Sequence, residues 1–142
     1  MNKTIFVLAL LFLSSCSTFT KEAVTCPNTT SPKGAEEIVA NSENGSLIYM
    51  GLRGIELYCT INGSDINMEA LINIRAIRSN PIEDDSVPVM ISIVSIDINN
   101  KEYDRDQLSY SQFLLKGSKI VDRITAMNII VPIKGKVLIG IK

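Results

Sequence analysis

The sequence predicts an all-β domain, an antiparallel immunoglobulin-like β-sandwich of about seven strands. Apolar residues alternate with polar ones along residues 66–76, an Asn-Gly pair at residues 62–63 marks a hairpin, and turn-forming residues recur between short apolar segments. A helix would spread the apolar side chains of residues 66–76 around its whole circumference. The alternation therefore favours a strand with one buried face.

The expected strands follow one another with short turns between them. Residues 34–40 fit either a short helix capped by Ser31 or a first edge strand, and the segment before them is rich in turn-forming residues. Residues 47–50 and 54–61 form one interrupted strand or two short ones. Further strands are expected at residues 66–76, 87–98, 102–115, 120–133 and 137–141.

Three local patterns add detail to these strands. Asn62 and Gly63 are expected to be the central residues of a type I′ turn, in which both need positive φ. Residues 87–98 are nearly all β-branched or apolar, which is typical of a strand buried on both faces. In the strand expected at residues 137–141, Val137, Ile139 and Ile141 lie on one face.

Residues 1–15 are expected to be a signal peptide. Lys3 precedes an apolar run at residues 5–13, which is far shorter than the roughly 20 residues of a membrane-spanning helix. The run ends in Leu13-Ser14-Ser15-Cys16, which resembles a bacterial lipobox. The resemblance implies cleavage before Cys16 and attachment of lipid to that cysteine. The alternative is an ordinary secretory signal in which Cys16 is incidental.

The lipobox implies a place in the cell for the protein. Lipid at Cys16 would anchor it to a membrane of the bacterial cell envelope, because several acyl chains give stable anchoring. Ser17 follows the cysteine where an aspartate would suggest retention in the inner membrane, so the outer membrane, facing the periplasm, is favoured. Residues 16–25 are then a lipidated tether, and residues 26–142 are the sandwich domain.

Two further cysteines, Cys26 and Cys59, are expected to form a disulfide. An exported domain folds in an oxidising compartment, where an even pair of cysteines is normally oxidised. Closing the loop between them would add roughly 3–4 kcal/mol to the free energy of unfolding. Two buried free thiols are the alternative.

The composition excludes several classes of function. The formal net charge is −1 and no basic cluster is present, so no nucleic-acid partner is expected. The chain contains no histidine, which excludes a Ser-His-Asp triad, a Cys-His pair and a histidine-containing zinc site. No cofactor, metal site or enzymatic activity is expected, although an enzyme that uses only carboxylates stays open.

Three groups of side chains are candidate sites. Residues 83–85 and the acidic residues between Asp97 and Asp106 offer oxygen ligands for calcium, but their spacing differs from that of an EF-hand loop. Solvated loop charges are the simpler interpretation. Tyr103, Tyr110 and Phe113 could form a stacking surface for sugars, or they could pack on the sheet.

Five features together resemble a family of small, uncharacterised lipoproteins of Gram-negative bacteria. They are the lipobox, Cys-Pro at residues 26–27, a second cysteine in Leu57-Tyr58-Cys59-Thr60, the long alternating strand at residues 66–76, and a final strand with an isolated glycine, Gly140. The resemblance covers most of the mature chain, although the long tail expected after residues 137–141 is missing.

The family implies no known activity. The expected function is a non-catalytic envelope lipoprotein that binds an envelope protein partner or supports an envelope assembly. Edge strands that can pair with another chain would suit this function. The alternative is a module that binds a small ligand or a glycan.

Overall fold

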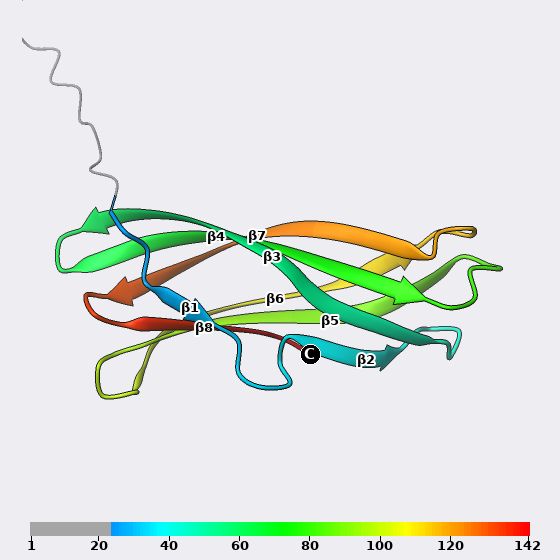
Figure 1. Ribbon diagram of the computed structural model, residues 1–142, viewed down its shortest axis with the longest axis horizontal. Coiled ribbons are helices and arrows are strands. Elements are labelled where there is room, and N and C mark those ends of the chain that lie inside the picture. The colour runs from blue at the N-terminus through cyan, green and yellow to red at the C-terminus, as the bar shows by residue number, and fades with distance from the viewer. Residues whose placement is uncertain (1–23) are drawn as a thin grey trace, which may run out of the picture.

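The computed structural model describes residues 24–142, which form eight strands in two four-stranded sheets (Figure 1). Sheet A has the order β2-β3-β4-β7 and sheet B the order β1-β8-β5-β6. The strands are β1 (Asn28–Thr30), β2 (Glu37–Asn41), β3 (Leu47–Asn62), β4 (Asp65–Arg78), β5 (Asp85–Ile96), β6 (Glu102–Leu114), β7 (Ile120–Pro132) and β8 (Lys136–Ile141).

The predicted all-β, antiparallel sandwich is confirmed. All pairs of neighbouring strands are antiparallel except β1 and β8, which run parallel. The strand order differs in detail from that of immunoglobulin domains, in which the first, second, fourth and fifth strands share one sheet. Here the consecutive strands β2, β3 and β4 form a meander, and β7 joins them.

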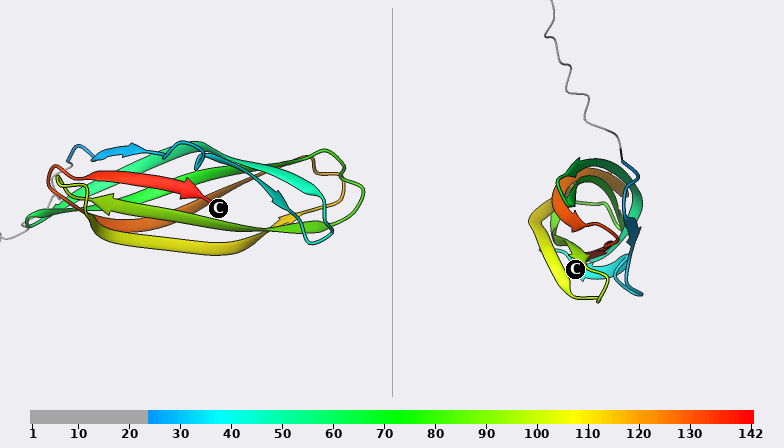
Figure 2. Two further views of the ribbon diagram at one scale, coloured as in Figure 1. Left: turned by 90° about the horizontal axis from the view of Figure 1, so that it is seen from below. Right: turned by 90° about the vertical axis from the view of Figure 1, so that its left-hand side faces the viewer.

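The residues that the alternation at 66–76 assigned to the buried face of a strand lie in the core. Ile66, Met68, Ala70, Ile72, Ile74 and Ala76 are all buried, with Ile72 and Ala70 fully so. From β8, Val137, Ile139 and Ile141 are buried as well. The two sheets therefore pack through one apolar layer. The right-hand view of Figure 2 shows the strands of the two sheets end-on.

Residues 47–62 form one long strand rather than two. β3 pairs with β2 over its first part and with β4 along nearly its whole length. A bulge between Leu52 and Gly54 leaves Arg53 without a partner on β4, which explains why the apolar alternation of the sequence breaks there. At about 3.3 Å per residue, β3 runs about 50 Å along the molecule.

The hairpin after β3 lies where the sequence placed it, but its turn is shifted by one residue. Asn62 pairs with Asp65, so the two central residues are Gly63 and Ser64 rather than Asn62 and Gly63. Gly63 has a φ of 64°, whereas Asn62 and Ser64 do not have positive φ. Glycine at the first central position is typical of a type II′ turn, and the expected type I′ turn is absent.

Other elements correct or complete the sequence-based prediction. Residues 37–41 are a strand, which settles the ambiguity between helix and edge strand. β1 was not predicted, because its sequence contains only polar residues after a proline. β5 is not buried on both faces throughout, since Pro88 and Met90 are exposed.

A seam joins the two sheets where the edge strands β6 and β7 lie side by side. Asp106 and Asp104 of β6 accept hydrogen bonds from the backbone N–H groups of Asn128 and Ile130, at 3.3 and 2.8 Å. The Ser95 hydroxyl donates to the Ile130 carbonyl at 2.7 Å. These side chains form hydrogen bonds with backbone N–H and C=O groups of β7. Those groups could otherwise pair with another strand.

Removing both seam carboxylates is expected to expose the β7 edge and promote self-association. In the double variant Asp104→Ala/Asp106→Ala, the N–H groups of Asn128 and Ile130 lose their acceptors and become available to a second chain. Sedimentation velocity at increasing concentration should show a larger average mass than for the wild type.

The matched control for this prediction keeps an acceptor at each position. Asp104→Asn/Asp106→Asn retains a carbonyl oxygen, so it should sediment like the wild type. Equal self-association of the two double variants would contradict the role assigned to the seam.

Candidate functional site

The structure pairs Cys26 with Cys59, as the sequence predicted. The two sulfur atoms lie 2.11 Å apart and the Cα atoms 5.4 Å apart. Cys59 faces the core from β3, and Cys26 holds the segment before β1 against it. The expected signal peptide, the lipidated Cys16 and most of the expected tether at residues 16–25 lie outside the described residues.

The first acidic group, residues 83–85, is divided by the fold. Asp85 is buried, and its Oδ1 accepts hydrogen bonds from the N–H groups of Ser86 and Asn44, at 2.8 and 3.2 Å. Asp84 accepts from the N–H of Lys116 at 2.7 Å, while Glu83 is exposed. These carboxylates therefore hold loops in place and do not converge on one point.

The acidic residues of the second group are similarly engaged. Asp97 accepts from the N–H groups of Asn99 and Lys101, which closes the β5–β6 turn. Glu102 pairs with Arg105, and Asp104 and Asp106 belong to the seam. Among residues 24–142, no three side chains of metal-ligating type come together.

The aromatic residues proposed as a sugar-stacking surface do not form one. Tyr103 and Phe113 are exposed near opposite ends of β6, and Tyr110 points the other way, toward the seam. The ring of Tyr110 lies under the guanidinium of Arg123, 4.1 Å from its carbon atom. Alternation along the strand separates these side chains, so that the sequence-based candidate is wrong as a single platform.

A hollow of about 610 Å³ lies on the outer face of sheet B. Its floor comes from half-buried apolar residues of β5 and β8: Val94, Ile96 and Leu138. The loop of residues 32–35 forms one wall, and Ile141 donates its N–H to the Ala35 carbonyl at 2.8 Å. Figure 1 shows this loop beside the end of β8.

Gly140 permits the close approach of the loop at residues 32–35. A Cβ at this position would lie 2.9 Å from the Cβ of Ala35, closer than side-chain carbons normally pack. The isolated glycine of the final strand is therefore explained by the loop that packs on it.

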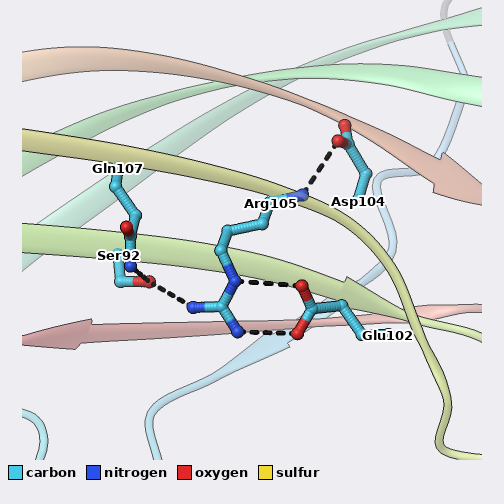
Figure 3. Close-up of polar contacts among 5 residues, drawn as sticks. All are labelled: Ser92, Glu102, Asp104, Arg105 and Gln107. Carbon is cyan, nitrogen blue, oxygen red and sulfur yellow. Dashed lines mark hydrogen bonds and ion pairs between the residues drawn. The ribbon is translucent and has the colours of Figure 1, made fainter.

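Arg105 is one of the residues that line the hollow. Its guanidinium is held from two sides (Figure 3). Its Nε and Nη2 donate to the Glu102 carboxylate at 2.9 and 2.6 Å, and its Nη1 donates to Ser92 Oγ at 3.2 Å. Gln107 donates to the same hydroxyl at 3.3 Å. Ser92 is buried, so the guanidinium is fixed by a bidentate ion pair and a covered hydroxyl.

The electrostatics follow from this pairing. The hydrogen bond from Arg105 is the main reason that the pKa of Glu102 lies below its usual value, and Glu102 in turn raises the pKa of Arg105. Ser92 Oγ accepts hydrogen bonds from two donors, and the neighbouring carboxylate is bound to Arg105, so the arrangement does not provide an activated nucleophile.

A second notable region is the distal end, which we define as the loops at residues 42–46, 79–84 and 115–119. Arg78, at the end of β4, is buried at 3% exposure and joins the second and third of these loops. Its guanidinium donates to the backbone carbonyls of Ser118 and Glu83, at 2.9 and 2.8 Å, and to that of Leu115.

Large apolar side chains are exposed on and beside the distal end. Ile82 and Leu115 are each 64% exposed, and Phe113 at the end of β6 is 70% exposed. On the adjoining outer face of sheet A, the register aligns Val39, Tyr49, Ile77 and Ile120 in one row across all four strands. Apolar side chains gathered in this way are typical of surfaces that contact another molecule.

The alternation of β4 contained a signal for Arg78. Continuing the buried face of residues 66–76 by one step places an arginine on the buried side, which requires partners for its charge. No comparable signal marks the hollow, because Arg105, Ser92 and residues 32–35 are brought together only by the pairing of the strands in sheet B.

Asp85 is expected to make stability depend on pH at the distal end. Burial raises the pKa of this carboxyl, but hydrogen bonds from Ser42, Ser86 and Asn44 and the charge of Arg78 outweigh that effect and lower it. A depressed pKa in the folded state stabilises the protein above the unfolded pKa, and this contribution is lost as the pH falls through the folded value.

Thermal unfolding of Asp85→Asn should therefore show a lower midpoint than the wild type at pH 7, and the difference should shrink below about pH 4. Glu43→Gln, in an exposed part of the same region, should unfold like the wild type at both pH values. A constant difference between Asp85→Asn and the wild type across this range would contradict the assignment.

Comparisons with protein-family models, with curated proteins and with solved structures found no match to this chain. Within residues 24–142, no helix has the length and hydrophobicity that a transmembrane span requires.

Proposed function

We propose that the protein is a lipid-anchored lipoprotein of the bacterial envelope, held by Cys16 in the outer membrane and facing the periplasm. The proposal includes membership of the family of small, uncharacterised lipoproteins of Gram-negative bacteria, whose lipobox and cysteine pattern this chain resembles. It acts there as a non-catalytic module that binds a protein partner. The observation that carries the interaction role is the group of exposed apolar side chains at the distal end.

The geometry of the sandwich supports this role. The described chain begins at one end of the elongated domain, and the loops of the distal end lie at the other (Figures 1 and 2). β3 connects the two ends over about 50 Å. A domain anchored through its N-terminus would thus hold Ile82, Phe113 and Leu115 away from its own membrane surface.

Buried Arg78 supports a binding surface of fixed shape. The loops that carry Ile82 and Leu115 are joined through its hydrogen bonds, and Gly117 also donates its N–H to the Pro81 carbonyl at 2.8 Å. A preformed surface loses less conformational entropy when a partner binds, which favours affinity.

Site-specific photo-crosslinking tests this proposal in the native membrane. The full-length protein is made in its own host with a photoreactive amino acid at Phe113 or, separately, at Leu115. We expect each to give the same discrete crosslinked protein. Ile98, which is also 70% exposed but lies in the β5–β6 turn at the opposite end, is the matched control and should not give that product.

The outcome at the three positions decides the role of the distal end. Crosslinking of one product from Phe113 and Leu115 alone supports it, whereas the same products from Ile98, or none at all from the distal positions, contradict it. A parallel Cys16→Ala variant tests the anchor by itself: it should be lost from the membrane fraction, and its retention there would overturn the lipoprotein assignment.

A further inference from the structure

We propose that the hollow on sheet B binds a small anionic amphiphile, a molecule with a carboxylate or phosphate head and a short hydrocarbon body. The proposal concerns a face that is separate from the distal end and does not depend on the protein partner. It rests on how the hollow divides into a cationic rim and an apolar floor.

The rim is rich in positive charge. Three residues with cationic side chains line the hollow, Lys33, Arg105 and Lys142, and Glu102 is the one lining residue with a carboxylate side chain. Glu102 occupies the Nε and Nη2 side of the Arg105 guanidinium, so that it neutralises a single cation. The two lysines remain to attract an anionic head group.

The floor is apolar because the outward positions of the two central strands of sheet B carry aliphatic residues. Val94 pairs with Leu138 across β5 and β8, and Ile96 follows on the same face. All three side chains are half-buried, and the loop of residues 32–35 lines the same hollow. A hydrocarbon body would cover the apolar surface that remains accessible.

The fixed position of Arg105 defines where the head group would lie. In the register of sheet B, Arg105 of β6 is paired with Val94 of β5, and Val94 is paired on its other side with Leu138 of β8. Charge and apolar surface are therefore neighbours on three adjacent strands, about 5 Å apart from strand to strand. The volume of about 610 Å³ lies within the usual range of small-molecule sites.

The test is an NMR titration of the full chain in phosphatidylcholine nanodiscs, with labelled valine and leucine methyl groups. The probes are octanoate, octyl phosphate and the neutral octanol, which share one hydrocarbon length. We expect saturable shifts of the Val94 and Leu138 signals with both anions, and binding of octanol about tenfold weaker. Stronger binding of octanoate or of octyl phosphate identifies the preferred head group.

Two variants separate the rim from general charge effects. Lys33→Ala/Lys142→Ala should lose the preference for the anions over octanol, while Lys116→Ala/Lys119→Ala, which removes the same charge at the distal end, should retain it. The proposal is overturned if no probe shifts the Val94 and Leu138 signals saturably, or if octanol binds as tightly as the anions. It is likewise overturned if both double variants behave alike.

Discussion

Replacing both cysteines of the Cys26–Cys59 disulfide with serine is expected to lower the free energy of unfolding by about 3–4 kcal/mol. The disulfide closes a loop with a sequence separation of 33 residues, so its loss returns considerable conformational freedom to the unfolded chain. The folded chain is also weakened locally, because β1 pairs with β8 through only three residues. Urea denaturation followed by circular dichroism measures the effect.

The cysteine variants offer controls within the same chain. Cys16→Ser should not change the unfolding midpoint of the domain, because Cys16 lies outside the described sandwich. Reduction of the wild type should reproduce the midpoint of the Cys26→Ser/Cys59→Ser variant. If that variant unfolded within about 1 kcal/mol of the oxidised wild type, the loop-closure account would be wrong.

Replacing Arg78 with methionine is expected to lower the free energy of unfolding by about 3 kcal/mol. The side chain of methionine fills much of the same space but donates no hydrogen bond. The carbonyls of Glu83, Leu115 and Ser118 would then lose their charged donor in a part-buried site. The same variant should speed amide hydrogen exchange in the loops of the distal end.

Arg75 of the same strand provides the comparison. It forms a bidentate ion pair with Asp122, at 2.7 Å for each contact, but this pair is largely exposed to solvent. Arg75→Met should therefore change the unfolding midpoint far less than Arg78→Met. Equal effects of the two substitutions would show that burial of Arg78 and its bonds to two loops do not matter for stability.

Much of the fold could be predicted from the sequence, because the period of a strand is a local property. The alternation at residues 66–76 defined both a strand and its buried face, and Val137, Ile139 and Ile141 did so again for β8. The pairing of Cys26 with Cys59 followed from the expectation that a domain of this kind is exported and oxidises an even pair of cysteines. These predictions needed no knowledge of which strands are neighbours.

The remainder depends on contacts between distant segments. β1 is a strand only because β8 offers it a partner, and its own residues resemble a turn. The split of residues 83–85 into one buried and two exposed carboxylates is set by the β2–β3 loop that packs beside them. The hollow on sheet B likewise needs three strands and a loop in register, which residue types alone do not reveal.

The disulfide also determines how the domain would respond to mechanical force. A force applied to the chain before Cys26 reaches the Cys26–Cys59 disulfide before it reaches the short strand β1. Part of the load passes through Cys59 into β3, which pairs with β4 along nearly its whole length. A domain tethered at this side would thus transmit part of the tension directly into its longest strand pair, and β1 would carry less of it.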